Sequence, residues 1–142
     1  MAFLFLADHA EHLSKLIKPA LAEGKDVITD RCIDSRYAYQ GVTLKKYFQD
    51  PIKWLKKIHE PFSVVPDRTI LLVTDVDVAI ERISRKGRKR IKLEDKDFLE
   101  KVQRNYLELV EDERERFIKI DANAELDFVE RTVERELKKI LS

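Results

Sequence analysis

An acidic and a basic residue follow directly on a short apolar run near position 30. Residues 27–29 (Val-Ile-Thr) are typical of a buried strand, and Asp30 and Arg31 come next. A carboxylate at the end of a strand can hold Mg²⁺ through water, and the planar guanidinium of an arginine can bind a phosphate. The alternative is an ordinary structural ion pair, and these residues taken alone favour it. Other parts of the sequence must therefore decide between the two.

A second group of charged residues lies between positions 82 and 92. Seven of these eleven residues are lysine or arginine, none is acidic, and Gly87 stands among them as a candidate hinge. A cationic loop of this kind can close over polyphosphate and stabilise charge during phosphoryl transfer. The alternatives are a nucleic-acid-binding patch and a solvated run that is balanced by the acidic residues after it. Nucleic acid is the weaker alternative, because the net charge of the chain is only +1 and no aromatic residues interrupt the basic ones.

Two histidines and one cysteine are the remaining candidates for metal or nucleophilic chemistry. His9 and His12 are three residues apart on one expected helix, but no set of cysteines or carboxylates completes a metal site around them. Cys32 is the sole cysteine, so the chain can form no internal disulfide, which is typical of a reducing cytoplasm. We interpret the histidines as partly exposed or hydrogen-bonded side chains, and Cys32 as a small buried one.

Helices and strands are predicted to alternate along the chain, which is the pattern of an α/β fold with a parallel sheet. Gly24 is expected to end the first helix, Pro51 to kink or break the third, and Asn123 to lie near the cap of the last. Ligands bind beyond the carboxyl ends of the strands in such sheets. The apolar spacing predicts helices over residues 3–22, 33–40, 44–58, 76–84, 94–111 and 126–140, and strands over 26–30, 69–74 (apolar on both faces, as in a covered sheet) and 117–120.

Taken in order, these features resemble the thymidylate kinase family over essentially all 142 residues. Three segments carry the resemblance. The middle of such a kinase is similar to FLFLADHAEHLSKLIKPALAEGKDVITDRCIDSRYAYQG, and its next strand and helix are similar to PDRTILLVTDVDVAIERI. Its lid, the helix after the lid and its last strand are similar to RKGRKRIKLEDKDFLEKVQRNYLELVEDERERFIKIDA. The resemblance implies one domain over residues 1–142 that holds the dTMP site and the lid. It implies a three-layer α/β fold of the P-loop kinase type, with a parallel sheet and helices on both faces, incomplete at the amino terminus. The family commonly forms homodimers through helices that include the one at residues 3–22, so the resemblance favours a homodimer and leaves other oligomeric states open. A cytoplasmic location is expected from the single cysteine.

The family transfers the γ-phosphoryl group of ATP to dTMP with Mg²⁺, giving dTDP. On this resemblance Asp30 helps to hold Mg²⁺, Arg31 binds the phosphate of dTMP, and Phe5 stacks on the thymine ring. Phosphoryl transfer depends on positioning and on neutralising charge, and these residue types suit both. The resemblance further implies a nucleoside pocket lined by His9, Ser35, Arg36, Tyr39 and Gln40, and lid arginines at Arg82, Arg88 and Arg90.

Four positions depart from the family pattern. His9 stands where the family usually has an arginine that reads a carbonyl group of the base, and Arg36 stands where a small polar residue is common. Cys32 takes the place of an aromatic residue or a histidine, and Lys89 the place of an acid before the lid arginine. We therefore leave the base selectivity and the role of Arg36 open.

The largest departure concerns the phosphate-binding loop G-x-x-x-x-G-K-[ST]. The three glycines of these 142 residues do not supply it. The resemblance places the strand that carries this loop between the strands predicted at 26–30 and 69–74. We therefore expect these two strands to pair with each other, to borrow a strand from another chain, or to associate through their edges.

Three functional interpretations follow. The first is the dTMP-site and lid portion of a thymidylate kinase, without turnover by itself because the ATP loop is missing. The second is a non-catalytic nucleotide-binding or regulatory subunit that needs a partner carrying the loop. The third and weakest is a nucleic-acid-binding protein that uses the basic residues 82–92.

Overall fold

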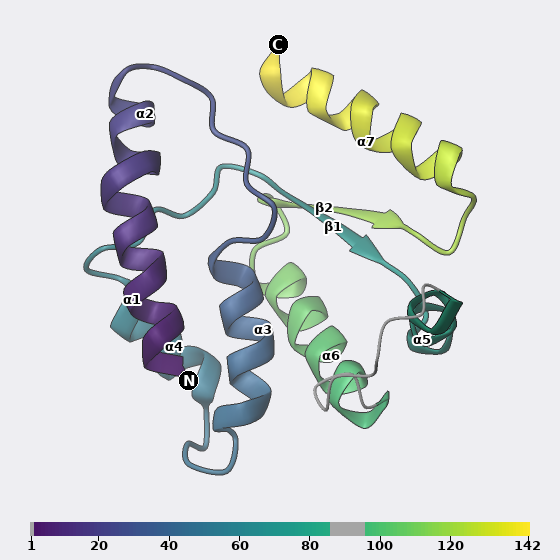
Figure 1. Cartoon of the computed structure of the whole chain (residues 1–142), viewed down its shortest axis with the longest axis horizontal. Coiled ribbons are helices and arrows are strands. Elements are labelled where there is room, and N and C mark those ends of the chain that lie inside the picture. Colours follow the sequence, from purple (N-terminus) through teal and green to yellow (C-terminus); the bar gives the residue numbers. More distant parts are fainter. Residues whose placement is uncertain (1, 86–95) are drawn as a thin grey trace. The chain divides into compact units, whose positions relative to one another are not determined.

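The computed structural model describes residues 2–85 and 96–142, which form helices and a small parallel sheet (Figure 1). Two compact units divide the chain: a helical unit, Met1–Val65, and a sheet unit, Pro66–Ser142. None of the helices in the described ranges is both long and apolar enough to cross a lipid bilayer. The elements are α1 (Ala2–His12), the π-helical turn η1 (Leu13–Ile17), α2 (Lys18–Ala22), α3 (Ile33–Leu44), α4 (Pro51–His59), β1 (Thr69–Val73), α5 (Val76–Arg85), α6 (Lys96–Asp112), β2 (Phe117–Asp121) and α7 (Leu126–Leu141).

The first predicted helix is confirmed, because α1, η1 and α2 follow one another without a break. The widened π turn directly precedes α2, where Pro19 lacks the N–H that would bond to the carbonyl four residues earlier. Gly24 ends the helix as predicted, with φ at +74°, and its N–H donates to the carbonyl oxygen of Leu21 at 3.0 Å.

The prediction of a strand at residues 26–30 is wrong. Residues 25–30 form neither helix nor strand, and Ile28 is exposed. A strand is stabilised by main-chain hydrogen bonds to a neighbour, and β1 pairs with β2 instead. The expected pairing between 26–30 and 69–74 is therefore absent from the described structure. A three-residue β-branched run does not by itself hold an extended conformation.

The helix predicted at 44–58 is broken, as Pro51 indicated it could be. Helix α3 continues to Leu44, and α4 begins at Pro51. Proline is tolerated at the start of a helix because an N–H there has no hydrogen-bond partner within the helix. Asp50 caps α4, because its Oδ1 accepts a hydrogen bond from the main-chain N–H of Lys53 at 3.0 Å. α3 packs against both α1 and α4. The buried apolar residues of the helical unit are Leu13, Ile17, Ile33, Tyr37, Ala38 and Leu55.

The sheet unit is built on β1 and β2, which run parallel from Thr69 opposite Phe117 to Val73 opposite Asp121. Helix α7 packs against β2, and α5 packs against α6 (Figure 1). The sheet of the described residues has two strands, whereas the resemblance implies a larger parallel sheet with helices on both faces. Leu72 is half exposed, so the prediction of a β1 covered on both faces is wrong for this residue. The buried apolar side chains here are Val102, Leu109, Phe117, Ile120 and Val129.

Asn123 links the carboxyl ends of the two strands. The sequence predicted that it would lie near the cap of the last helix, but it does not cap α7. Helix α7 begins at Leu126, three residues further on, with Glu125 as its N-cap. The Asn123 Oδ1 instead accepts hydrogen bonds from the hydroxyl of Thr74 at 2.7 Å and from the N–H of Asp75 at 2.9 Å. These two residues lead from β1 into α5.

Candidate functional site

Most of the predicted site residues of the helical unit belong to two side-chain groups. One group is the pair Arg31 and Tyr39. The other, called the Arg36 cluster below, consists of Phe5, Asp8, His9 and Arg36. The α1 members recur at helical spacing, and they face α3 because these two helices pack together.

Arg31 precedes α3 and has a left-handed backbone, with φ at 64°. A residue with a side chain adopts this conformation at a cost of roughly 1 kcal/mol, and such residues gather at functional sites. The guanidinium carbon of Arg31 lies 5.2 Å from the centroid of the Tyr39 ring, and Nη2 donates a long, 3.5 Å hydrogen bond to the phenol oxygen. Because Arg31 is exposed, its remaining donors can meet an anion.

Arg36 lies on α3, and its side chain is only 17% exposed. Its guanidinium carbon lies 5.8 Å from the centroid of the Phe5 ring, which is itself 43% exposed. Its Nη2 lies 3.6 Å from the carboxylate of Asp8, which is mostly exposed. Arg36 Nε is buried and has no hydrogen-bond partner in the described part of the chain. Burial lowers the pKa of Arg36, but the group stays charged at any ordinary pH.

His9 is 3% exposed, and its Nε2 is buried without a hydrogen-bond partner among the described residues. Burial, with the nearby charge of Arg36, lowers the pKa of His9 to about 4. The imidazole is therefore neutral at pH 7 and offers one donor and one acceptor. The expectation that His9 has no metal role stays a prediction.

Three further predicted residues lie on or just before α3 with less distinctive surroundings. Ser35 is half-buried, and its N–H donates to the carbonyl oxygen of Cys32 at 3.1 Å. Gln40 Oε1 accepts a hydrogen bond from the hydroxyl of Thr43 at 3.2 Å. Asp30 is exposed just before Arg31.

No group of three or more histidine, cysteine, aspartate or glutamate side chains that could hold a metal occurs within residues 2–85 and 96–142. Mg²⁺, however, needs only one or two carboxylates when substrate phosphates and water complete its shell. The exposed carboxylate of Asp30 fits that limited role. Cys32 does not fit a nucleophile, because burial raises the pKa of its thiol.

The predicted lid falls largely outside the description. Arg88, Lys89 and Arg90 lie outside the described residues, as does most of the basic stretch 82–92. Arg82 lies within them, at the end of α5, where Nη1 donates to the carbonyl oxygen of Ala122 at 2.7 Å. In this structure Arg82 therefore secures the turn that follows β2.

Two residues of the helical unit escaped the sequence analysis. Asp8 is a surface charge on α1 whose partner lies on α3, and His59 is a buried side chain near the end of α4. His59 lies beside Tyr37, with ring centroids 5.6 Å apart. The apolar spacing within α4 indicated that one face of this helix is buried. The proximity of His59 to His9 could not be predicted in this way, because it depends on how three helices pack.

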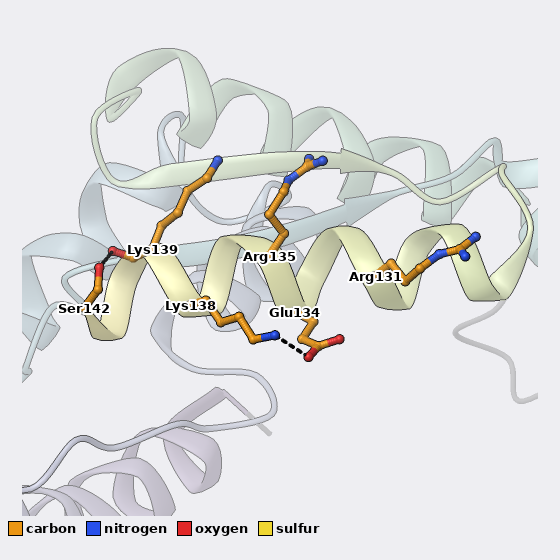
Figure 2. A pocket seen from close by; sticks show the side chains of 6 residues that line it. All are labelled: Arg131, Glu134, Arg135, Lys138, Lys139 and Ser142. Carbon is orange, nitrogen blue, oxygen red and sulfur yellow. Dashed lines mark hydrogen bonds and ion pairs between the residues drawn. The ribbon is translucent and has the colours of Figure 1, made fainter.

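A hollow of about 480 Å³ occurs along α7 and is lined by residues of that helix and by Ser142, which directly follows it (Figure 2). Its lining is mostly charged, and Lys138 is paired with Glu134 at 2.8 Å. No predicted site residue lines it, and ion pairs of this kind are typical of a solvated helix face. The lining residues are Arg131, Glu134, Arg135, Lys138, Lys139 and Ser142.

Comparisons with known proteins agree on one family. The family model for thymidylate kinase matches residues 1–133. The probable thymidylate kinase of Methanosarcina mazei is 49% identical over 139 residues, which cover 98% of this chain and 66% of that protein. Those of Methanosarcina barkeri and Natronomonas pharaonis are 46% and 45% identical, with 99% and 93% of this chain and 68% and 66% of the relative covered.

The chain thus spans about two thirds of the length of the curated relatives it matches. The match includes every residue of the two groups described above. On this evidence the chain belongs to the thymidylate kinase family.

Proposed function

We propose that this chain provides the dTMP site of a thymidylate kinase, which transfers the γ-phosphoryl group of ATP to dTMP and releases dTDP. The family match supports the reaction class. The observation that carries the proposal for this chain is the geometry of Arg31. It is exposed, has a left-handed backbone and lies beside Tyr39, so an anion-binding group and an aromatic surface stand together directly after Asp30.

The roles proposed for the residues follow from their chemistry. Arg31 binds the phosphate of dTMP through its free donors, and Asp30 holds Mg²⁺ together with phosphate oxygens and water. Tyr39 lies under the deoxyribose, where a 2′-hydroxyl would crowd it. Phe5 offers its exposed ring for stacking on the base. The pocket is completed by His9, Ser35, Arg36 and Gln40, and the lid arginines Arg88 and Arg90 neutralise the transferring phosphoryl group.

ATP needs a loop that these 142 residues do not contain. Main-chain N–H groups of a G-x-x-x-x-G-K-[ST] loop cradle the β- and γ-phosphates, and its lysine neutralises them. The three glycines of this chain provide no such sequence. We therefore propose that phosphoryl transfer requires a loop from outside residues 1–142, and that the 142-residue chain binds dTMP without turning it over.

Two measurements on the 142-residue chain test the proposal. Calorimetry should detect dTMP binding that is lost in Arg31→Gln, and coupled detection of ADP should show no dTMP-dependent release. Mixing the chain with a second chain that carries a G-x-x-x-x-G-K-[ST] loop should produce turnover.

The control is dTMP binding by Lys45→Gln, which removes an exposed charge after α3 and should bind normally. Absence of dTMP binding would overturn the proposed site. Turnover by the chain alone, at a rate near the typical 10 per second or so, would overturn the proposed dependence on an outside loop.

A further inference from the structure

The Arg36 cluster contains more hydrogen-bonding capacity than the described structure uses. Arg36 Nε and His9 Nε2 are both buried and both lack a hydrogen-bond partner among the described residues. Buried polar groups are almost always paired, and an unpaired one costs about 1–3 kcal/mol. Two such groups on neighbouring helices, beside the exposed ring of Phe5, indicate a place where a ligand supplies the missing partners.

Only one of the two groups can act as a cation. Burial and the charge of Arg36 hold the pKa of His9 at about 4, so its imidazole is neutral at pH 7. Arg36 keeps its charge, and all of its five N–H groups are donors. At neutral pH the charged hydrogen-bond donors of the cluster therefore belong to Arg36 on α3. Helix α1 contributes the neutral imidazole of His9.

The one ion pair of Arg36 in the described structure leaves these donors available. The Arg36 Nη2 is 3.6 Å from Asp8, beyond a good hydrogen bond, and the Asp8 carboxylate is mostly in solvent. Because the Asp8 carboxylate can be solvated by water instead, a ligand acceptor can compete with it for Arg36. A planar ring stacked on the exposed part of Phe5 would lie near the guanidinium, whose carbon is 5.8 Å from the centroid of the Phe5 ring.

We propose that Arg36 is the specificity-determining residue that distinguishes a pyrimidine with a carbonyl group at ring position 4 from one with an amino group there. A guanidinium donates to the carbonyl oxygen of thymine or uracil. The amino group of cytosine is itself a donor, so it would leave the Arg36 donors unpaired in a desolvated place. This inference rests on the proposed function, because it assumes that the site takes a pyrimidine nucleotide.

The test compares the binding of dTMP, dUMP and dCMP to the 142-residue chain at pH 7. The wild-type chain should bind dTMP and dUMP more tightly than dCMP. In Arg36→Met this preference should fall by about tenfold to a hundredfold, as expected for loss of a charge-assisted hydrogen bond. Arg36→Lys keeps the charge without the planar fork and should recover only part of the preference. Lys45→Gln, which removes an exposed charge outside the Arg36 cluster, is the control and should retain it.

A second measurement needs no ligand. Titration of the His9 imidazole by NMR should show a higher pKa in Arg36→Met than in the wild type, because a neighbouring positive charge is removed. An unchanged His9 pKa would overturn the placement of Arg36 beside His9.

The outcomes separate this inference from the proposed function. If dTMP binds but Arg36→Met keeps the full preference for a carbonyl group, or if wild type binds dCMP equally well, the role of Arg36 is wrong and the dTMP site stands. If the wild-type chain binds no pyrimidine nucleotide, both are wrong. If Arg36→Met fails to fold, Arg36→Lys provides the test. An undiminished preference of Arg36→Lys for dTMP and dUMP over dCMP would show that the guanidinium fork is not needed.

Discussion

The imidazole rings of His9 and His59 lie edge to face inside the helical unit, with their centroids 6.1 Å apart and their planes at 61°. His59 is 2% exposed, and its Nδ1 lies 2.8 Å from the carbonyl oxygen of Leu55, so Nδ1 carries the proton and donates. Burial is the main reason why the pKa of each histidine is lowered, and Arg36 lowers both further. His59 and His12 also lower the pKa of His9, and Asp8 opposes them. Both rings are therefore neutral near pH 7.

The free energy of unfolding is expected to fall as the pH drops from about 6.5 to about 4. In the unfolded chain a histidine binds a proton near pH 6.5, whereas folded His9 binds one only near pH 4. The unfolded state takes up more protons in this window, so the stability is complete above it and is lost on acidification through it. The loss from His9 is on the order of 3 kcal/mol. Urea unfolding between pH 8 and pH 4 measures it.

Two variants isolate the histidine from the carboxylates that titrate over the same range. His9→Met removes one titrating group from its buried place and should weaken the pH dependence, to which His59 and the carboxylates still contribute. His12→Gln removes an exposed histidine from the same helix and should change it much less, because His12 lowers the pKa of His9 less than burial and Arg36 do. A pH dependence of His9→Met equal to that of wild type would show that burial of His9 does not control acid stability.

A second prediction concerns the link between the ends of β1 and β2. Asn123→Ala removes the acceptor for the Thr74 hydroxyl and the Asp75 N–H, and should lower the free energy of unfolding by about 1–2 kcal/mol. Asn123→Asp keeps an oxygen at the same place and should be close to wild type. Chemical unfolding of the three proteins measures the difference. Equal losses in the two variants would mean that Asn123 does not act through these hydrogen bonds.

The end of the first helix gives a third prediction. Gly24 has φ at +74°, and a Cβ there would meet no described atom within 4 Å, so a side chain is opposed by the backbone conformation alone. Gly24→Ala should therefore cost about 1 kcal/mol in the free energy of unfolding. Gly24→Asn should cost less, since asparagine tolerates the left-handed region better. Thermal unfolding of both variants checks this, and an alanine variant as stable as wild type would contradict it.

Local signals explain which parts of the fold could be predicted. Gly24 and Pro51 act through their own backbone chemistry, so the first helix ends and the third breaks where the sequence indicated. The strand expected at 26–30 failed because a strand depends on a neighbour that local sequence does not specify. The prediction that Asn123 lies near the cap of the last helix failed for the same reason, because its hydrogen-bond partners lie 48 and 49 residues away in the sequence.

The candidate site divides in the same way. The order Asp30, Arg31, Tyr39 is visible in the sequence, but the left-handed conformation of Arg31 is not. The contact between Arg36 and Phe5 depends on the packing of α3 against α1, which no residue spacing within either helix reveals.

The fourth prediction separates the backbone of Arg31 from its guanidinium. Arg31→Gly and Arg31→Ala both remove the contact with Tyr39 and the proposed phosphate ligand, so both should lose dTMP binding by calorimetry. Only glycine adopts φ near 64° without strain. Arg31→Gly should therefore be more stable than Arg31→Ala by about 1 kcal/mol, measured by urea unfolding. Equal stability would show that the Arg31 backbone stores no strain. Retained dTMP binding in both variants would instead remove Arg31 from the phosphate site, so the two measurements test the conformation and the chemistry of this residue independently.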